Sequence, residues 1–138
     1  EHVNASLFRG GAPLARPPLT VEDYGAAELR LNTGAQVRIA CSWNLHAGHD
    51  AVINADFHGA KGGARMRNVN GSFYDFRAAR LSGTGRETLC EPPDAWGGRA
   101  AVHWARTLSQ SPMFDPAADA LVRVAEAIDA IYGRNGTA

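Results

Sequence analysis

The sequence predicts an α+β fold: a largely antiparallel, open sheet of six or seven strands, with two C-terminal helices packed on one face. Three observations predict it. Runs in which apolar and polar residues alternate fill the chain as far as the pair Pro92-Pro93. Short turn sequences join most of these runs, which favours antiparallel hairpins. Beyond the prolines the apolar spacing becomes helical, and strands followed by helices are typical of α+β domains.

The length and composition of the chain indicate one globular domain over residues 1–138. Of its 138 residues, 45% are hydrophobic and 20% are charged, and the formal net charge is zero. A neutral chain has no general attraction for nucleic acid or for an anionic membrane surface. No apolar run is long enough for a membrane helix, and no signal peptide is recognisable. The two cysteines, Cys41 and Cys90, favour buried free thiols over a disulfide and therefore a cytoplasmic location.

The clearest strand runs from Gln36 to Asn44. Its odd positions place Val37, Ile39, Cys41 and Trp43 on one face, and its even positions are mostly polar. Such alternation is typical of a strand with one dry face and one wetter face. We expect this strand to be central in the sheet.

The other strands are expected on both sides of it. Their predicted ranges are 2–9, 24–31, 51–58, 64–69, 73–81 and 86–91. Asn32-Thr33-Gly34-Ala35 and Asn70-Gly71 are turn sequences that join neighbouring strands as hairpins. The segment from Gly10 to Thr20 is rich in glycine and proline and is predicted to be a loop.

Two helices are expected after the strands. The first covers Gly97 to Leu108, and the second starts at Asp115-Pro116, with Asp as the N-cap, and stops at Gly133. Two helices can cover one face of the sheet only. A partner subunit or another domain is therefore expected on the open face.

Three stretches carry a resemblance to a known family. They are Ser42-Trp43-Asn44, the run FHGAKGGARMRNVNGSFYDF from Phe57 to Phe76, and IDAIY from Ile128 to Tyr132. Together with the order of elements, they resemble the C-terminal domain of the Gfo/Idh/MocA oxidoreductases, which include glucose–fructose oxidoreductase and inositol dehydrogenase. The resemblance covers the chain from about His2 to Gly133, and its motifs are mainly structural.

The resemblance implies a two-domain parent enzyme. An N-terminal Rossmann domain would bind NAD or NADP, and this chain would bind a sugar or polyol substrate and form a homo-oligomer through its open sheet face. The start at Glu1 without an initiator Met also favours a fragment that lacks the Rossmann domain. Family catalysis uses a Glu-Lys-Pro motif and a later Asp and His, and neither pattern occurs here, because Lys61 lies in a glycine turn. No catalytic, cofactor-binding or metal-binding residue is therefore assigned, and whether the chain alone is an enzyme is left open.

Five residues are candidates for contact with a substrate. They are Trp43, Asn44, His46, His49 and Arg99. An indole beside an amide suits a sugar ring, although packing in the core is the commoner role for a tryptophan in this position. The histidines could hydrogen-bond a polyol at neutral pH, or they could be merely solvated. Arg99 could bind an anion at the start of a helix, or it could simply begin that helix.

Two rival functions remain. The chain could be a free-standing, non-catalytic α+β binding or dimerisation module. It could also be a small histidine-dependent metal enzyme, although the spacing of His46 and His49 is not the i, i+4 spacing of a helical zinc pair, and His58 is the only further ligand in view.

Overall fold

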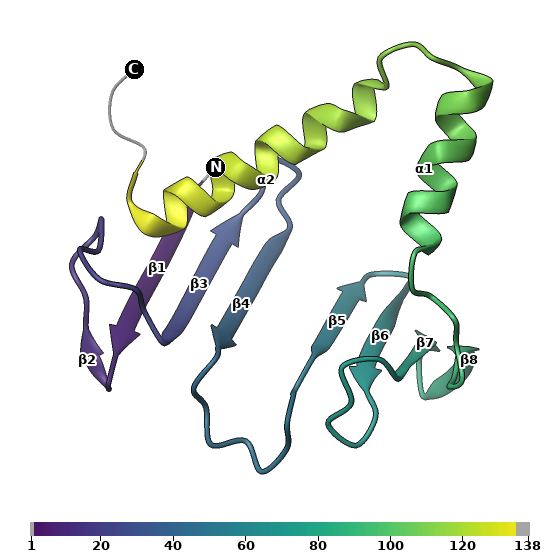
Figure 1. Cartoon of the computed structure of the whole chain (residues 1–138). Coiled ribbons are helices and arrows are strands. Elements are labelled where there is room, and N and C mark those ends of the chain that lie inside the picture. The colour runs from purple at the N-terminus through teal and green to yellow at the C-terminus, as the bar shows by residue number, and fades with distance from the viewer. Residues whose placement is uncertain (1, 135–138) are drawn as a thin grey trace. The chain divides into compact units, whose positions relative to one another are not determined.

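The computed structural model describes residues 2–134, and strands precede two C-terminal α-helices along the chain (Figure 1). The α+β class is therefore confirmed. The described residues form two compact units. The first contains the chain up to Leu45 and the segment from Phe114 onward, and the second is the continuous segment between His46 and Met113.

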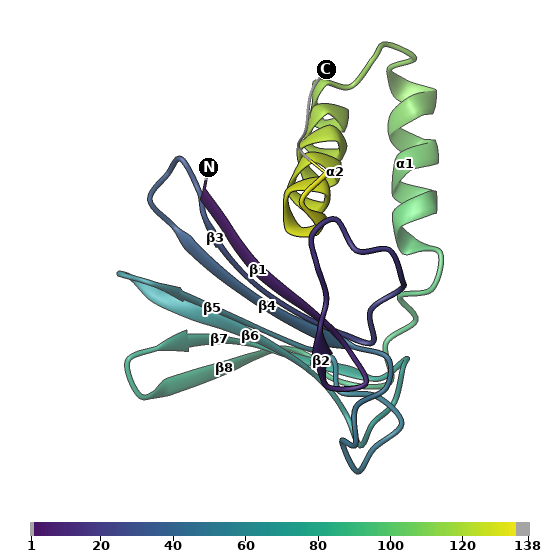
Figure 2. The same cartoon turned by 90° about the vertical axis from the view of Figure 1, so that its left-hand side faces the viewer.

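The first unit contains a four-stranded antiparallel sheet in the order β2-β1-β3-β4. Its strands are β1 (His2–Arg9), β2 (Ala12–Pro13), β3 (Tyr24–Arg30) and β4 (Gln36–Ser42). The register aligns Ala5 with Ala27 and Ile39, so the alternating apolar residues of three strands share one face. Figure 2 shows these strands from the side.

Packing on this face requires small residues next to large ones. Leu7 is buried, and its register partner is Gly25, where an added Cβ would lie 3.3 Å from Leu7 Cδ2. Glycine at position 25 therefore leaves room for the leucine.

The helix α2 (Asp119–Tyr132) packs against β1. A short 3-10 helix at Pro116–Ala118 precedes it, and the Asp115 carboxylate accepts a hydrogen bond of 2.9 Å from the Ala117 N–H, as the predicted N-cap should. The helix ends at Gly133, whose φ of 70° is the left-handed value that favours glycine. Both predicted ends of this helical segment are confirmed.

The loop from Gly10 to Thr20 is tied to this helix by Arg16. Its guanidinium donates to the Ala5 carbonyl at 3.2 Å and to the Ala130 carbonyl at 2.6 Å. One side chain therefore connects β1 to the last turn of α2. The loop also contributes the short strand β2, which the sequence did not predict.

The second unit contains another four-stranded antiparallel sheet, in the order β5-β6-β7-β8. Its strands are β5 (Asn54–Gly59), β6 (Gly62–Asn68), β7 (Phe76–Ser82) and β8 (Gly85–Cys90). The turn between β5 and β6 requires glycine. A Cβ on Gly63 would lie 2.6 Å from the Phe57 carbonyl oxygen, and Gly62 has a φ of 152°.

The helix α1 (Arg99–Gln110) follows β8 in this unit. None of its residues is buried. Its predicted apolar stripe is consequently exposed, and Trp104 and Leu108 lie on the surface.

The prediction of a single sheet of six or seven strands is wrong, because the strands form two sheets of four. The prediction of two helices on one face of that sheet is replaced accordingly: α2 packs against β1 of its own sheet, and α1 belongs to the other unit. The strand β4 is an edge strand, since its backbone pairs with β3 only among the described strands.

Hydrogen bonds from two side chains explain why two strands begin later than predicted. The Asn68 amide binds the Ala51 carbonyl and the Ile53 N–H, each at 2.9 Å, so β5 starts only at Asn54. The Ser72 hydroxyl accepts from the N–H groups of Tyr74 and Asp75, which delays β7 to Phe76. Such local bonds from side chain to backbone compete with strand pairing.

Candidate functional site

The indole of Trp43 lies just beyond the end of β4 and is 75% exposed. Its Nε1–H donates to the Glu22 carbonyl at 2.8 Å, which fixes the orientation of the ring. Core packing of Trp43, one of the two possibilities raised by the sequence, is therefore excluded. An oriented, exposed indole can stack on the apolar face of a ligand.

Asn44 follows this indole and is also exposed. Its backbone N–H donates to the Ser42 hydroxyl at 3.1 Å, and that hydroxyl donates to the Asp23 carbonyl at 2.7 Å. The Asp23 carboxylate in turn accepts from the Gly10 N–H at 2.7 Å. The backbone that carries Trp43 and Asn44 is therefore held by the loop before β3.

Glu22 joins the same end of the sheet to α2. Its carboxylate accepts a hydrogen bond from the Tyr132 hydroxyl, while its backbone carbonyl accepts from Trp43. This hydrogen bond, together with partial burial, raises the pKa of Tyr132 above its ordinary value. The sequence does not single out Glu22, and it marks Tyr132 only as the end of the IDAIY stretch. No sequence signal distinguished the pair, because its members are far apart in the chain.

The loop histidines belong to the second unit. His46 and His49 are exposed, and Gly71 lies against His49, because a Cβ on this glycine would be 3.0 Å from His49 Cβ. Within residues 2–134, no three His, Cys, Asp or Glu side chains are grouped so that they could hold a metal ion. The geometry therefore offers nothing in support of the metal-enzyme hypothesis.

Arg99 begins α1 and is engaged by a neighbouring carboxylate. Its guanidinium donates through both terminal nitrogens to Asp94, at 3.2 Å for the Nη1–Oδ2 pair. This interaction lowers the pKa of Asp94. An anionic ligand of Arg99 would therefore compete with Asp94.

Asp94 also affects a cysteine thiol. The Cys90 Sγ lies 3.5 Å from Asp94 Oδ2. Partial burial is the larger cause that raises the pKa of Cys90, and the hydrogen bond to Asp94 is the next. Both cysteines are free thiols, but neither is buried as the sequence suggested, since Cys41 is exposed and Cys90 is half-buried.

A second group of aromatic residues lies in the same unit. The Trp96 Nε1–H donates to the Tyr74 carbonyl at 2.7 Å, and the Trp96 ring meets Phe76 edge to face, with centroids 6.1 Å apart. Tyr74 and Phe73 are both exposed beside this anchored indole. Trp96 is not among the residues that the sequence marks as candidate contacts.

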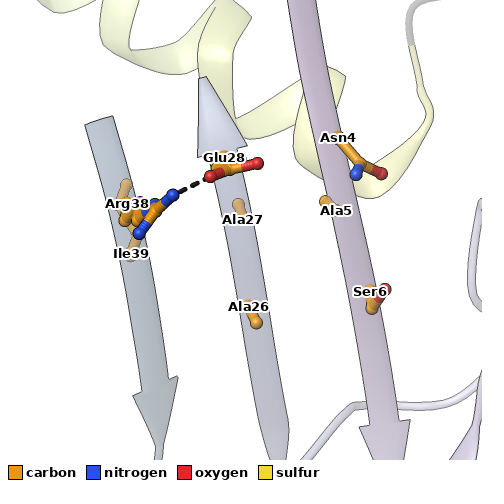
Figure 3. A pocket seen from close by; sticks show the side chains of 8 residues that line it. All are labelled: Asn4, Ala5, Ser6, Ala26, Ala27, Glu28, Arg38 and Ile39. Carbon is orange, nitrogen blue, oxygen red and sulfur yellow. Dashed lines mark hydrogen bonds and ion pairs between the residues drawn. The ribbon is translucent and has the colours of Figure 1, made fainter. Parts of the chain in front are cut away.

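The first sheet carries a shallow hollow of about 310 Å³ on the face opposite α2 (Figure 3). Leu29 lies next to residues of α2, and side chains alternate between the two faces of a strand. Ala26 and Glu28 of β3 therefore point away from α2, toward the hollow. The ion pair between Glu28 and Arg38, 2.7 Å long, crosses it. The remaining polar side chains are Asn4 and Ser6. The charges that line this hollow therefore balance.

Of the five predicted substrate contacts, the structure brings Trp43 and Asn44 together in the first unit. His46, His49 and Arg99 belong to the second. None of the three comparisons, with family models, curated proteins and solved structures, gives a match. Within the described residues, no helix is both long enough and apolar enough to cross a membrane.

Proposed function

We propose that this chain is the substrate-binding and oligomerisation domain of an NAD(P)-dependent oxidoreductase acting on a sugar, a polyol or a related hydroxyl compound. Hydride would pass between the nicotinamide, held by a separate Rossmann domain, and a hydroxyl-bearing carbon of the substrate. The chain would shape the substrate pocket and join subunits. The resemblance to the Gfo/Idh/MocA oxidoreductases is the basis for the reaction class.

The observation that carries the proposal is how little apolar surface the described residues bury. Among residues 2–134, only Ala5, Leu7 and Ala79 are buried hydrophobic residues. Both units expose large ones, including Ile39, Trp43, Phe57, Tyr74, Trp104, Phe114 and Leu121. Burial of one large apolar side chain contributes about 1.5–3 kcal/mol. Exposed apolar surface on this scale is typical of chains that bind partners.

The choice of a hydroxyl compound as substrate is supported by Trp43. Its ring is exposed yet held by Glu22, so a ligand would not need to order it. Asn44 adds an exposed amide next to it. An aromatic surface with a few polar groups is a common composition for a small-molecule site.

The substrate assignment is tested by NMR titration of the chain with glucose, myo-inositol and related polyols. We expect the Trp43 indole N–H and the Asn44 amide to shift, and we expect Trp43→Ala to abolish the shifts at Asn44. Trp104→Ala is the matched control, because Trp104 is also an exposed tryptophan but lies on α1. Equal loss of binding in both variants, or no binding in the wild type, would count against the site.

The redox assignment requires the parent protein, including whatever is encoded upstream of Glu1. We expect that protein to bind NADH or NADPH in a fluorescence titration. If it binds no nicotinamide cofactor, the oxidoreductase proposal fails.

A non-catalytic binding or dimerisation module is the second candidate. The same exposed apolar surface favours it, since such surface requires a partner but no redox chemistry. The two candidates differ in the nicotinamide titration alone. Partner binding without cofactor binding would select the module.

A further inference from the structure

We infer that β4 is a self-complementary pairing edge, and that two copies of this chain join their β4 strands antiparallel about a two-fold axis at Ile39. The inference goes beyond the proposed function, because the subunit contact expected from the sequence lies on the open sheet face and not on a strand edge. It does not depend on the redox assignment.

The direction of the backbone groups of β4 follows from the hairpin that joins it to β3. The Leu31 N–H donates to the Ala35 carbonyl at 2.9 Å, so this pair is hydrogen-bonded. Hydrogen-bonded and non-hydrogen-bonded pairs alternate along an antiparallel ladder. Val37, Ile39 and Cys41 therefore bond to β3, and the N–H and C=O groups of the alternate residues point to the free edge. The outward residues are Gln36, Arg38, Ala40 and Ser42.

This edge lacks the features that usually prevent strand pairing. Proteins protect edge strands with proline, lysine, bulges or very short strands. The sequence of β4, QVRIACS, contains neither proline nor lysine, and its register with β3 is regular over seven residues. Its one charged side chain, Arg38, is already paired with Glu28.

The opposite edge of the same sheet is protected. It ends in β2, which has two residues, one of them Pro13, and pairs only with the end of β1. Further along β1, the Ala5 carbonyl is capped by the Arg16 guanidinium. The two edges of this sheet therefore differ: one is blocked within its own unit, whereas among the described strands β4 pairs with β3 only.

A second copy of β4 satisfies the free edge without placing like charges directly opposite each other. With Ile39 on the axis, the outward groups of Arg38 meet those of Ala40 in the partner copy, and those of Gln36 meet those of Ser42. Arg38 thus directly faces an alanine. The two copies of Arg38 are diagonal neighbours on the same face, where each is paired with the Glu28 of its own chain. On the other face, Ile39 meets its own copy and Val37 meets Cys41. The exposed Ile39 side chain, at 43%, would gain an apolar neighbour.

Cysteine crosslinking tests both the pairing and its register. Facing residues in a non-hydrogen-bonded antiparallel pair have Cα atoms about 4.5 Å apart, within the range of about 4.4–6.8 Å for disulfides. In a Cys41→Ser, Cys90→Ser background, we expect Ile39→Cys to give a disulfide-linked dimer on mild oxidation. Val37→Cys is the matched control in that background. It should not crosslink, because the two copies of position 37 are offset by four residues, about 13 Å.

Restoring the native Cys41 should make the Val37→Cys variant crosslink. With Cys41 present and Cys90 still replaced, Val37→Cys should crosslink, because positions 37 and 41 face each other in the inferred register. Light scattering of the full chain should give twice the mass of one chain. Ala40→Pro, which removes an outward donor, should halve that mass with an unchanged circular dichroism spectrum.

Two results would overturn the inference. One is a chain that remains monomeric at micromolar concentration. The other is a dimer in which Ile39→Cys does not crosslink. In the second case Ala26→Arg, which places a charge in the hollow of Figure 3, identifies the alternative. Loss of the dimer in Ala26→Arg would assign the contact to the open face and leave the proposed function intact.

Discussion

The hydroxyl of Tyr132 donates a hydrogen bond to the carboxylate of Glu22, a residue 110 positions earlier in the chain. The bond connects the end of α2 to the loop before β3. Because the backbone carbonyl of Glu22 also accepts from the Trp43 indole, the candidate substrate-binding residue and the helix are held by the same loop residue.

Replacement of Tyr132 by Phe should lower the free energy of unfolding by about 1 kcal/mol, because a hydrogen bond to a partly exposed carboxylate is lost. Urea denaturation at neutral pH measures this. Trp43 fluorescence should also change, since Glu22 would lose one of its two partners. An unchanged unfolding midpoint would show that the bond contributes nothing to stability.

The same bond predicts a pH dependence. The pKa of Tyr132 is raised in the folded chain above its ordinary value of 10.0, so the folded state retains a proton that the unfolded state releases. This contribution to stability is complete below about pH 10 and is lost as the pH rises through the raised value. Denaturation curves at increasing alkaline pH should converge for the wild type and Tyr132→Phe.

Replacement of Arg16 by Ala should destabilise the chain by about 1 kcal/mol, since two hydrogen bonds to backbone carbonyls are lost at a largely exposed site. Hydrogen exchange should accelerate most in the last turn of α2, where Ala130 loses its donor. Arg106→Ala is the control, because Arg106 is an exposed arginine on α1, in the other unit. Equal effects in both variants would contradict the assigned role.

Replacement of Asp56 by Asn should destabilise the second unit at neutral pH but not in acid. Hydrogen bonds from Arg67 and then Arg65 lower the pKa of Asp56. The stabilisation is therefore present above the ordinary pKa of 3.8 and is lost as the pH falls through the lowered value. Chemical denaturation at about pH 7 and about pH 2 checks this. Glu87→Gln, which breaks a single exposed ion pair with Arg80, should have a smaller effect.

Replacement of Asp94 by Asn should accelerate alkylation of Cys90. The Asp94 carboxylate raises the pKa of this thiol, and only the thiolate reacts. Mass spectrometry of iodoacetamide labelling at mildly alkaline pH can follow Cys90 separately from the exposed Cys41. A slower or unchanged reaction at Cys90 would contradict this prediction, while Cys41 serves as the internal reference.

Much of the secondary structure could be predicted because local pattern determines it. The strand at His2–Arg9 and the Gly133 helix end agree with prediction residue for residue. The division into two sheets could not be predicted, because alternation identifies strands but not which edges pair. Sequence periodicity also could not reveal that the side chains of Asn68 and Ser72 would form hydrogen bonds with backbone groups that were expected to pair in strands.

The candidate site was predictable in its residue types but not in its surroundings. Trp43 and Asn44 were identified because an aromatic residue and an amide end a strong strand. Their support comes from Glu22 and Asp23, in a loop without a motif. Arg99 was identified from its place at a helix start, but its partner Asp94 depends on how the chain turns after β8.

The two units differ in how the chain builds them. The second is one continuous segment, whereas the first needs both the beginning and the end of the chain. During translation, β1 to β4 emerge before the second unit, and the helix that packs on β1 emerges only after it. Leu7 and its neighbours therefore remain uncovered by this helix until the second unit has been translated. Nascent chains stalled before Phe114 are therefore expected to need a chaperone, even though the segment between His46 and Met113 is already complete.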